Sequence, residues 1–315
     1  QASAGDLESA RLSAQATLAQ NYFLLRIADA QKELLDDTVA AYQRSWQLTT
    51  NRYNAGVAAK VDVVQADTQL KSTLAQVRDL GVQRAQLEHA IAVLIGAPPS
   101  TLSIPPKPLA IRIPNIPVGM PASLLERRPD IAAAERRVAA ANAQIGVAQA
   151  AFFPTVTLGA SGGMQASVFP RLFEWPSHFW SLGPALALAL FDGGLRQAQL
   201  EASRAAYDAT VAQYRQVVLN GIVEVEDNLA ALRVLEEEAD LLDQAVRSGR
   251  ESVELTLNQY KAGVVSFLNV VTVQTAALTN ERAAVTLLGR RLTAAVTLVK
   301  AIGGGWQAAS LAQNR

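Results

Sequence analysis

The chain has 315 residues, of which 50% are apolar and only 6% aromatic, and its 28 Lys and Arg balance its 28 Asp and Glu. Because no net charge attracts polyanions, we expect no nucleic-acid partner. The absence of cysteine excludes disulfides and thiolate metal sites. No apolar run approaches the roughly 18 residues that a membrane-spanning helix needs.

Residues 1–97 have the hydrophobic spacing of long amphipathic helices. Apolar side chains recur at steps of three and four residues, as on one packed face of a helix. These residues are Leu35, Val39, Tyr42 and Trp46, and then Leu87, Ile91 and Leu94. This part is predicted to be helical.

Prolines mark the next boundary. Nine of the 13 prolines fall between Pro98 and Pro129, so residues 98–129 are predicted to form an extended connector. Pro129 suits the first turn of a helix and Asp130 its N-terminus. We therefore interpret Arg127, Arg128 and Asp130 as structural residues at the start of a helix rather than as a functional cluster.

The segment from Phe152 to Phe191 contains only two charged residues, Arg171 and Glu174. Its two runs, TVTLGASGG and SLGPALALALF, alternate apolar with small or polar residues over 9–11 positions, the length of a transmembrane β-strand. The apolar positions predicted to face lipid are Val156, Leu158, Leu182, Leu186, Leu188 and Leu190. Trp175, Phe179 and Trp180 lie near one end, where an interfacial aromatic girdle is expected.

A soluble hairpin that covers a protein core is the alternative for this segment. Polar helices flank the hairpin, however, and offer no second layer to cover a leucine face, which favours lipid as the cover. Strand edges with unpaired backbone groups cannot lie in hydrocarbon, so the sheet must close. Two strands in each of two repeats make four, which is below the eight or so that a barrel needs. Closure therefore predicts that several subunits share one barrel.

The longest helix is predicted from about Gly194 to Gln259. Its apolar seam again has steps of three and four residues. The seam consists of Tyr207, Val211, Tyr214, Val218, Ile222, Val225, Leu229 and Leu232. At about 1.5 Å per residue such a helix extends roughly 100 Å, as in a coiled-coil rod.

The chain repeats itself without gaps at an offset of 207 residues. NRYNAGV begins at Asn51 and NQYKAGV at Asn258 (258 − 51 = 207), and Ile95-Gly96 matches Ile302-Gly303. This indicates an internal duplication. The counterpart of the uncharged hairpin would precede residue 1, so we expect the chain to be an N-terminally truncated part of a longer protein.

Several motifs together resemble one family. LLERRPDIAAAERRVAAANAQIGVAQAAFFPTVTLGASGG, SLGPALALALFDGGLRQAQ, NQYKAGVVSFLNVV and VKAIGGGW are similar to the signature of TolC-like outer-membrane efflux proteins, in particular their OprM/NodT branch. The likeness extends over essentially the whole chain, with the motifs in the same order.

The resemblance implies a mainly α fold with a small β part. Long antiparallel coiled-coil helices would form a periplasmic α-barrel, and membrane β-strands a shared twelve-stranded barrel, in a homotrimer. The implied role is the exit duct of a tripartite pump in the outer membrane of a Gram-negative bacterium. The partners would be outer-membrane lipid, a periplasmic membrane-fusion adaptor and an inner-membrane efflux transporter.

The predicted domains are the remainder of the first repeat (1–97), the connector (98–129), the second repeat (130–306, with a hairpin at about 154–191) and a C-terminal tail (307–315). By resemblance, the two AGV turns are periplasmic tips that narrow the tunnel and meet the adaptor, although plain helix–helix turns explain their glycines equally well. The candidate tip, gate and adaptor residues are Arg52, Tyr53, Gly56, Asp62, Tyr260, Gly263 and Asn269.

In the family, inward-facing acids often constrict the tunnel just after the second-repeat turn, whereas this chain has Asn269 and Thr272 there. Only the first repeat keeps an acid, Asp62, so we expect gating by helix packing and polar contacts rather than by an acidic ring. No phosphate-binding glycine loop, HExxH, GxSxG or nucleophile–histidine pair is present. We therefore predict a non-enzyme without cofactor or metal. The rival interpretation is a soluble periplasmic coiled-coil adaptor or scaffold, and a hydrolytic enzyme is a distant third.

Overall fold

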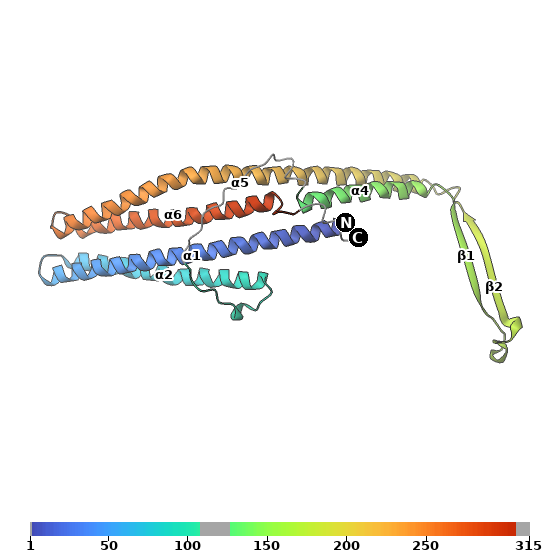
Figure 1. Ribbon diagram of the computed structural model, residues 1–315, viewed down its shortest axis with the longest axis horizontal. Helices are drawn as coiled ribbons and strands as arrows, with labels where there is room; N and C mark the ends of the chain where they lie inside the picture. Colours follow the sequence, from blue (N-terminus) through green and yellow to red (C-terminus); the bar gives the residue numbers. More distant parts are fainter. Residues whose placement is uncertain (1, 108–126, 307–315) are drawn as a thin grey trace. The chain divides into compact units, whose positions relative to one another are not determined.

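The computed structural model describes residues 2–107 and 127–306, which fall into two compact units. One unit comprises Gln1–Gly5 with Asp130–Leu219, and the other comprises Asp6–Pro129 with Asn220–Arg315. Residues 108–126 of the predicted connector and the predicted tail, 307–315, lie outside the described residues. Figure 1 gives the element labels used below.

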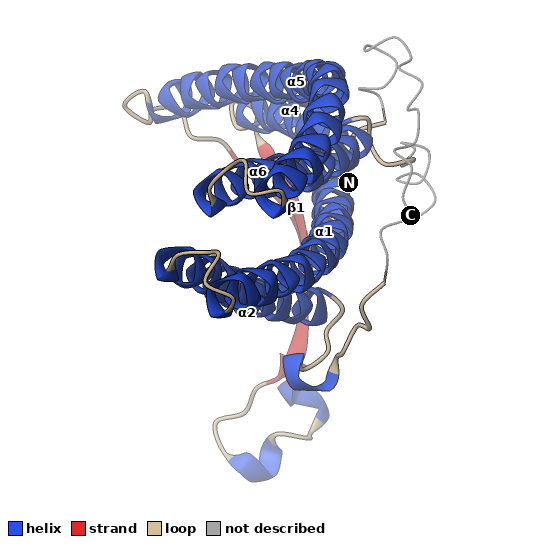
Figure 2. Ribbon diagram, turned by 90° about the vertical axis from the view of Figure 1, so that its left-hand side faces the viewer, coloured by secondary structure: helices blue, strands red, loops and turns tan. Residues whose placement is uncertain are grey.

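The larger unit contains two antiparallel helix pairs. Helix α1 (Ala2–Asn54) is followed by α2 (Lys60–Leu94), and α5 (Leu195–Lys261) by α6 (Phe267–Ala301). Figure 2 shows the helices of each pair side by side, joined by a short turn. Both predicted long helical regions are therefore present, and α5 agrees with its predicted bounds to within two residues.

The duplication is visible in the backbone. Helices α2 and α6 each have 35 residues and begin and end 207 positions apart. Both connecting turns have a glycine at positive φ, 76° for Gly56 and 77° for Gly263. Each turn also has the same three hydrogen bonds, because those of Ala55, Gly56 and Val57 recur at the positions 207 residues later. The two helix pairs are therefore one structural unit used twice.

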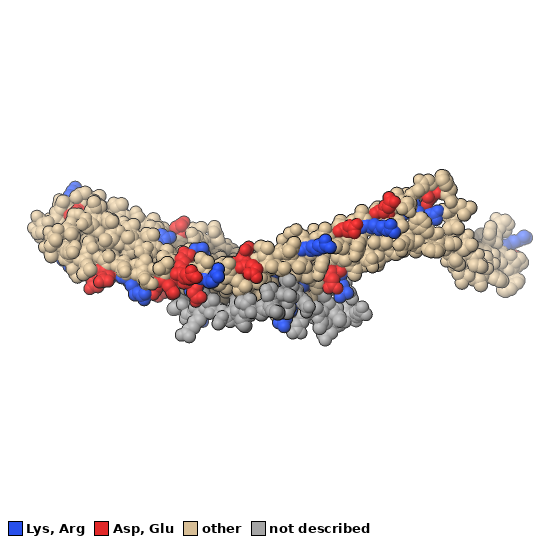
Figure 3. All heavy atoms as spheres, turned by 90° about the horizontal axis from the view of Figure 1, so that it is seen from above, with Lys and Arg blue, Asp and Glu red and all other residues tan. Residues whose placement is uncertain are grey.

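The predicted apolar seams lie in the helix contacts. Leu35, buried completely, packs with Leu80 of α2 and Leu278 of α6. In the second pair, Val225 of α5 packs with Leu298 and Ala301 of α6. Charged side chains of both signs are spread along the outer faces of the helices, as the face in Figure 3 shows. The core is therefore a set of narrow helix–helix seams.

The smaller unit contains α4 (Pro129–Ala150), the hairpin of β1 (Thr155–Met164) and β2 (His178–Ala187), and the start of α5. Helix α4 begins at Pro129 with Asp130 in its first turn, as predicted. The strands pair antiparallel from Thr155↔Ala187 to Met164↔His178.

The second strand lies earlier than predicted. It ends at Ala187, so Leu188 and Leu190 are not strand residues, and the prediction was wrong for these two positions. The reason is local: β1 begins immediately after Pro154, which has no N–H to donate, and β2 has no partner beyond Thr155. The Arg196 guanidinium donates instead to the Ala189 carbonyl.

The first part of the predicted connector, residues 98–107, lies against the first helix pair. It contains a short 3-10 helix, Pro99–Thr101, and then runs extended along the first helix pair. There the Ile104 N–H donates to Glu88 at 2.8 Å, and Arg26 donates to the Pro105 carbonyl at 2.9 Å. This part of the connector is therefore attached to α1 and α2 by specific hydrogen bonds.

Candidate functional site

The tip turns, defined here as residues 55–59 and 262–266, bring together part of the predicted gate. Arg52 donates to the Lys261 carbonyl at 2.9 Å, and its guanidinium lies 4.9 Å from the centre of the Tyr260 ring. A cation over an aromatic face is attractive. Arg52 therefore links the end of α1 to the end of α5.

Tyr260 occupies the centre of a small tip core. Its ring is 3% exposed and meets the Phe267 ring edge-on at 5.3 Å, with Ala66 and Val270 beside them. The Tyr260 hydroxyl is buried and has no hydrogen-bond partner within the described residues. Phe267 was not among the predicted tip residues. A comparison of the two repeats could have pointed to it, because the position 207 residues earlier is Lys60, so the repeats differ there in chemical character.

The other predicted tip residues are not gathered into this core. Tyr53 is 42% exposed. Asp62 lies in the first turn of α2, where its N–H donates to the Ala59 carbonyl, and Asn269 accepts a hydrogen bond from Ser266 at 3.3 Å. Gly56 and Gly263 serve as the positive-φ positions of the turns. The structure thus joins Arg52 to Tyr260 and leaves Tyr53 at the surface.

The β1–β2 hairpin has two different faces. Directly opposed residues of an antiparallel pair point to the same face. One face carries Val156 opposite Leu186, and the next apolar pairs are Leu158 with Pro184 and Ala160 with Leu182. The opposite face carries Thr157 with Ala185 and Ser161 with Ser181, whose hydroxyls are 2.8 Å apart.

The apolar face of the hairpin is open. Val156, Leu158, Leu182 and Leu186 are 64–74% exposed, and every residue of both strands is exposed. Leu188 and Leu190, beyond the strand, are 45% and 90% exposed. The four strand residues predicted to face lipid therefore share one face that none of the described residues covers.

An arginine ties the hairpin to its flanking helices. Arg196 binds Asp192 at 2.5 Å and the Ala151 carbonyl at 3.3 Å, and it lies 5.7 Å from the Phe152 ring. The hydrogen bond from Arg196 lowers the pKa of Asp192. These contacts, together with positive φ at Gly193 and Gly194, fix the change from strand to helix.

A charged cluster lies within the first helix pair and was not predicted. Asp29 accepts hydrogen bonds from Arg26 at 2.9 Å and from Arg84 at 2.8 Å, and Arg84 also binds Glu88 at 2.9 Å. The Asp29 side chain is 5% exposed. Burial alone would lower the pKa of Arg84, but its contacts with Asp29 and Glu88 outweigh burial and raise it. The cluster also binds the connector, so its role is structural.

Arg128, immediately before α4, also has a structural role. It is 8% exposed and binds Glu224 at 2.8 Å and the Ala301 carbonyl at 3.0 Å. This agrees with the structural interpretation of its sequence position.

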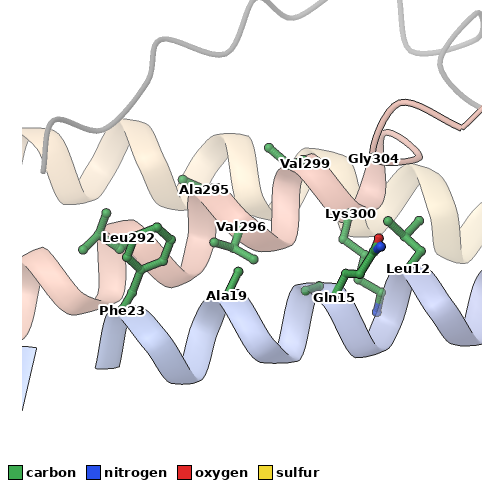
Figure 4. Close-up of a pocket in the computed structure, with 11 residues that line it drawn as sticks. Leu12, Gln15, Ala19, Phe23, Leu292, Ala295, Val296, Val299, Lys300 and Gly304 are labelled. Atoms are coloured by element: carbon green, nitrogen blue, oxygen red, sulfur yellow. The ribbon is translucent and has the colours of Figure 1, made fainter. Parts of the chain in front are cut away.

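A groove of about 260 Å³ between α1 and α6 is lined almost wholly by apolar side chains, including Leu12, Phe23 and Leu292 (Figure 4). Among the described residues, no three His, Asp or Glu side chains are grouped as a metal site would require. Within those residues, none of the helices carries an apolar run long enough to cross a bilayer.

The chain is similar to known outer-membrane proteins. The family model described as outer membrane efflux protein matches residues 1–97 and 120–304. The chain is 34% identical over 309 residues to the probable efflux pump outer membrane protein TtgC of Pseudomonas putida, and 34% identical over 300 residues to the outer membrane protein OprJ of Pseudomonas aeruginosa. Each match covers 95% of this chain and 63% of the relative, so the chain spans less than two thirds of these proteins.

Solved structures give the same assignment. The outer-membrane channel OprN aligns with a TM-score of 0.91 and 32% identity, covering 97% of this chain and 69% of that one. VceC of Vibrio cholerae aligns with a TM-score of 0.87 and 29% identity, covering 97% and 73%. The predicted TolC-like, mainly helical fold and the outer-membrane localisation are confirmed. The chain belongs to the outer membrane efflux protein family.

Proposed function

We propose that the protein containing this chain is the outer-membrane exit duct of a tripartite efflux pump and conducts small molecules passively, without catalysis. The observation that carries the proposal is the uncovered apolar face of the hairpin. Burying one such side chain is worth about 1.5–3 kcal/mol, so four of them in water would be a large cost. Acyl chains of the outer membrane would remove it.

The opposite face of the hairpin suits a water-filled lumen, because it presents Thr157, Ser161 and Ser181. Each strand has 10 residues, enough to cross the hydrocarbon when tilted. Within the hydrocarbon, the backbone groups along the unpaired edges of β1 and β2 would need hydrogen-bond partners from further strands. A homotrimer in which each complete two-repeat subunit supplies four strands would close a twelve-stranded barrel.

The tip turns are the proposed gate and adaptor contact. Arg52, Tyr53, Asp62, Tyr260 and Asn269 would line or brace the narrow end of the helical tunnel, with Gly56 and Gly263 forming the turns. Support comes from the Arg52 contacts with Lys261 and Tyr260, which hold the two tips together. The partners would be a periplasmic membrane-fusion adaptor at the tips and an inner-membrane efflux transporter beyond it.

The names of the relatives suggest the class of cargo. They include an antibiotic efflux pump protein, ArpC, and a toluene efflux pump protein, TtgC, both of Pseudomonas putida. We therefore propose small organic molecules as the cargo of this protein. A wide duct with few specific contacts would accept many of them.

Arginine substitutions on the two faces of the hairpin test the proposal. In the full-length protein, Leu158→Arg places a charge toward lipid and should cost about 2–4 kcal/mol near the midplane, with loss of outer-membrane insertion. Thr157→Arg, its neighbour on the other face, should insert normally and change the conductance measured in planar bilayers. Equal insertion of both variants, or a full-length protein that stays soluble without detergent, would favour the rival soluble scaffold.

The gate needs a separate measurement. Asp62→Ala and Arg52→Gln should each raise the open probability of the reconstituted channel, because they remove charge from the tips. If Asp62→Ala leaves conductance unchanged, Asp62 has no role in gating.

A further inference from the structure

The face of the β1–β2 hairpin that is proposed to line the lumen carries one aromatic side chain, that of Phe179. The other residues on this face are small or hydroxylated, and in the two strands, which the structure describes in full, they are Thr155, Thr157, Gly159, Ser161, Gly163, Ser181, Gly183, Ala185 and Ala187. Phe179 is therefore the only large apolar side chain on this face of the described strands. It lies opposite Gly163, one pair before the strands end at their connecting loop.

Gly163 allows the Phe179 ring to lie across β1. A Cβ added at Gly163 would be 3.0 Å from Cε1 and 3.1 Å from Cζ of the ring, closer than the 3.4–4 Å of an ordinary contact. The far edge of the ring therefore occupies the space above the glycine. Phe179 is nevertheless 47% exposed, so the rest of its ring is open to the lumen side of the sheet.

The opposite face of the hairpin shows that an aromatic residue need not lie over the glycine that it pairs with. Trp180 is paired with Gly162. The one atom within 4 Å of a Cβ added at Gly162 is the Phe179 carbonyl oxygen, and Trp180 is 81% exposed. Trp180 therefore extends away from the sheet, as an aromatic residue at a membrane interface does. Phe179, in contrast, is held against it.

Two hydroxyl groups lie beside the Phe179 ring on the same face. Ser161 and Ser181 form the next opposed pair inward, about 7 Å along the strands. Their Oγ atoms are 2.8 Å apart. Two hydroxyl groups that share one hydrogen bond keep one donor hydrogen and several acceptor lone pairs free. An aromatic ring and a hydrogen-bonding group are therefore presented together.

We propose that Phe179 and the Ser161–Ser181 pair form a binding site at the outer end of the lumen for planar aromatic molecules that carry a hydroxyl or amino group. The aromatic part would stack on the open part of the Phe179 ring, because aromatic pairs attract each other beyond the area that they bury. The polar group would reach the serine hydroxyls. This inference rests on the proposed duct and assigns one class of cargo a specific contact.

A contact of this kind would favour some cargo without trapping it. One aromatic pair corresponds to about a 2- to 10-fold difference in affinity. Because Gly163 lets the ring lie against the wall, the site would leave the lumen open. Aromatic cargo would therefore be preferred over saturated cargo of the same size, and both would pass.

The current through the full-length protein in planar bilayers tests the site. 2-Naphthol should reduce the current in a saturable way. Decahydro-2-naphthol, which has the same hydroxyl group but no aromatic ring, should need a concentration about 2- to 10-fold higher. Phe179→Leu should remove this preference, because it keeps an apolar side chain without a ring. Phe179→Tyr should retain it.

Two further variants separate the parts of the site. Gly163→Ala should reduce the preference although Phe179 is unchanged, because the added methyl group displaces the ring. Ser161→Ala combined with Ser181→Ala should weaken the effect of 2-naphthol and leave the effect of naphthalene, which has no hydroxyl group, unchanged.

The matched control is Phe173→Leu, the same change at a 71% exposed aromatic residue of the connecting loop, and it should leave the preference unchanged. The inference is overturned if the Phe179→Leu channel keeps the preference of the unmodified protein, or if Phe173→Leu loses as much of it. In both cases the channel conducts, so the duct proposal stands. A full-length protein that forms no channel in the bilayer would instead overturn the duct proposal, and the site with it.

Discussion

The two helix pairs share a backbone and differ in what holds them together. The Asp29–Arg84 pair of the first repeat has its counterpart 207 residues later in Glu236–Arg291. The first is 2.8 Å long with side chains 5% and 18% exposed, whereas the second is 3.5 Å long with Glu236 72% exposed. The position of the pair was kept after duplication, but only the first repeat buried it beneath the connector.

The tips differ in the opposite sense. In the second repeat, Tyr260 and Phe267 form a buried aromatic pair under Arg52, whereas the first repeat has an exposed Tyr53, with Lys60 at the position matching Phe267. Each repeat therefore has its own stabilising feature. The first repeat has a buried ion cluster, and the second has an aromatic tip core. Equal backbones do not imply equal stability.

The largest expected effect compares the two ion pairs. Asp29→Ala leaves the buried Arg26 without its carboxylate and removes one of the two carboxylates that bind Arg84, so it should lower the free energy of unfolding by about 3–5 kcal/mol. Glu236→Ala removes an exposed partner and should cost about 0–1 kcal/mol. Denaturant unfolding of the full-length protein in detergent measures both. Equal losses would show that burial does not distinguish the repeats.

The next effect concerns the contact between α6 and α1, which the two repeats do not share: Gly289 approaches Ile27, whereas an added Cβ at Gly81 meets no atom. Gly289→Val forces a side chain against Ile27 and should cost about 1–3 kcal/mol through overpacking. Adding Ile27→Val shortens the facing side chain and should recover part of that loss. Gly81→Val is the control, since no atom lies within 4 Å of its added Cβ. Failure of Ile27→Val to rescue would mean that the loss does not come from the contact with Ile27.

A smaller effect is expected at the tip. Arg52→Gln gives the first repeat the residue of the second and removes the cation from the Tyr260 ring, a loss of about 0.5–2 kcal/mol. Arg52→Lys keeps the charge and should retain part of the stability. Thermal unfolding followed by far-ultraviolet circular dichroism gives the measurement. A fully stable Arg52→Gln protein would mean that the tips are held by apolar packing alone.

The smallest effect concerns the Tyr260 hydroxyl. It is buried without a partner among the described residues, so Tyr260→Phe should change stability by no more than about 0.5 kcal/mol and can increase it. Tyr53→Phe serves as the exposed comparison. A loss above about 1 kcal/mol in Tyr260→Phe alone would indicate that the hydroxyl has a partner in the assembled protein.

Much of the fold could be predicted from the chain alone because the relevant signals are local. Steps of three and four residues predicted the helices, and the AGV motifs predicted both turns, where Gly56 and Gly263 have the expected positive φ. The end of β2 could not be found in this way, since Leu188 and Leu190 continue the alternation without a strand to pair with. Alternation of apolar and small residues predicts which face of a strand a side chain lies on. It does not predict where a strand ends, because that depends on whether a neighbouring strand is present to pair with it.

The sequence by itself determined the repeat, the long helices, the turns and the chemical difference between the two hairpin faces, because these depend on residue order and spacing. Only the tertiary structure decided that Asp29 is a buried acceptor, that Phe267 lies under Tyr260, and that Ile27 is covered while Val234 is not. The physical reason is that burial depends on which distant helix lies opposite, and identical positions in two repeats can have different neighbours.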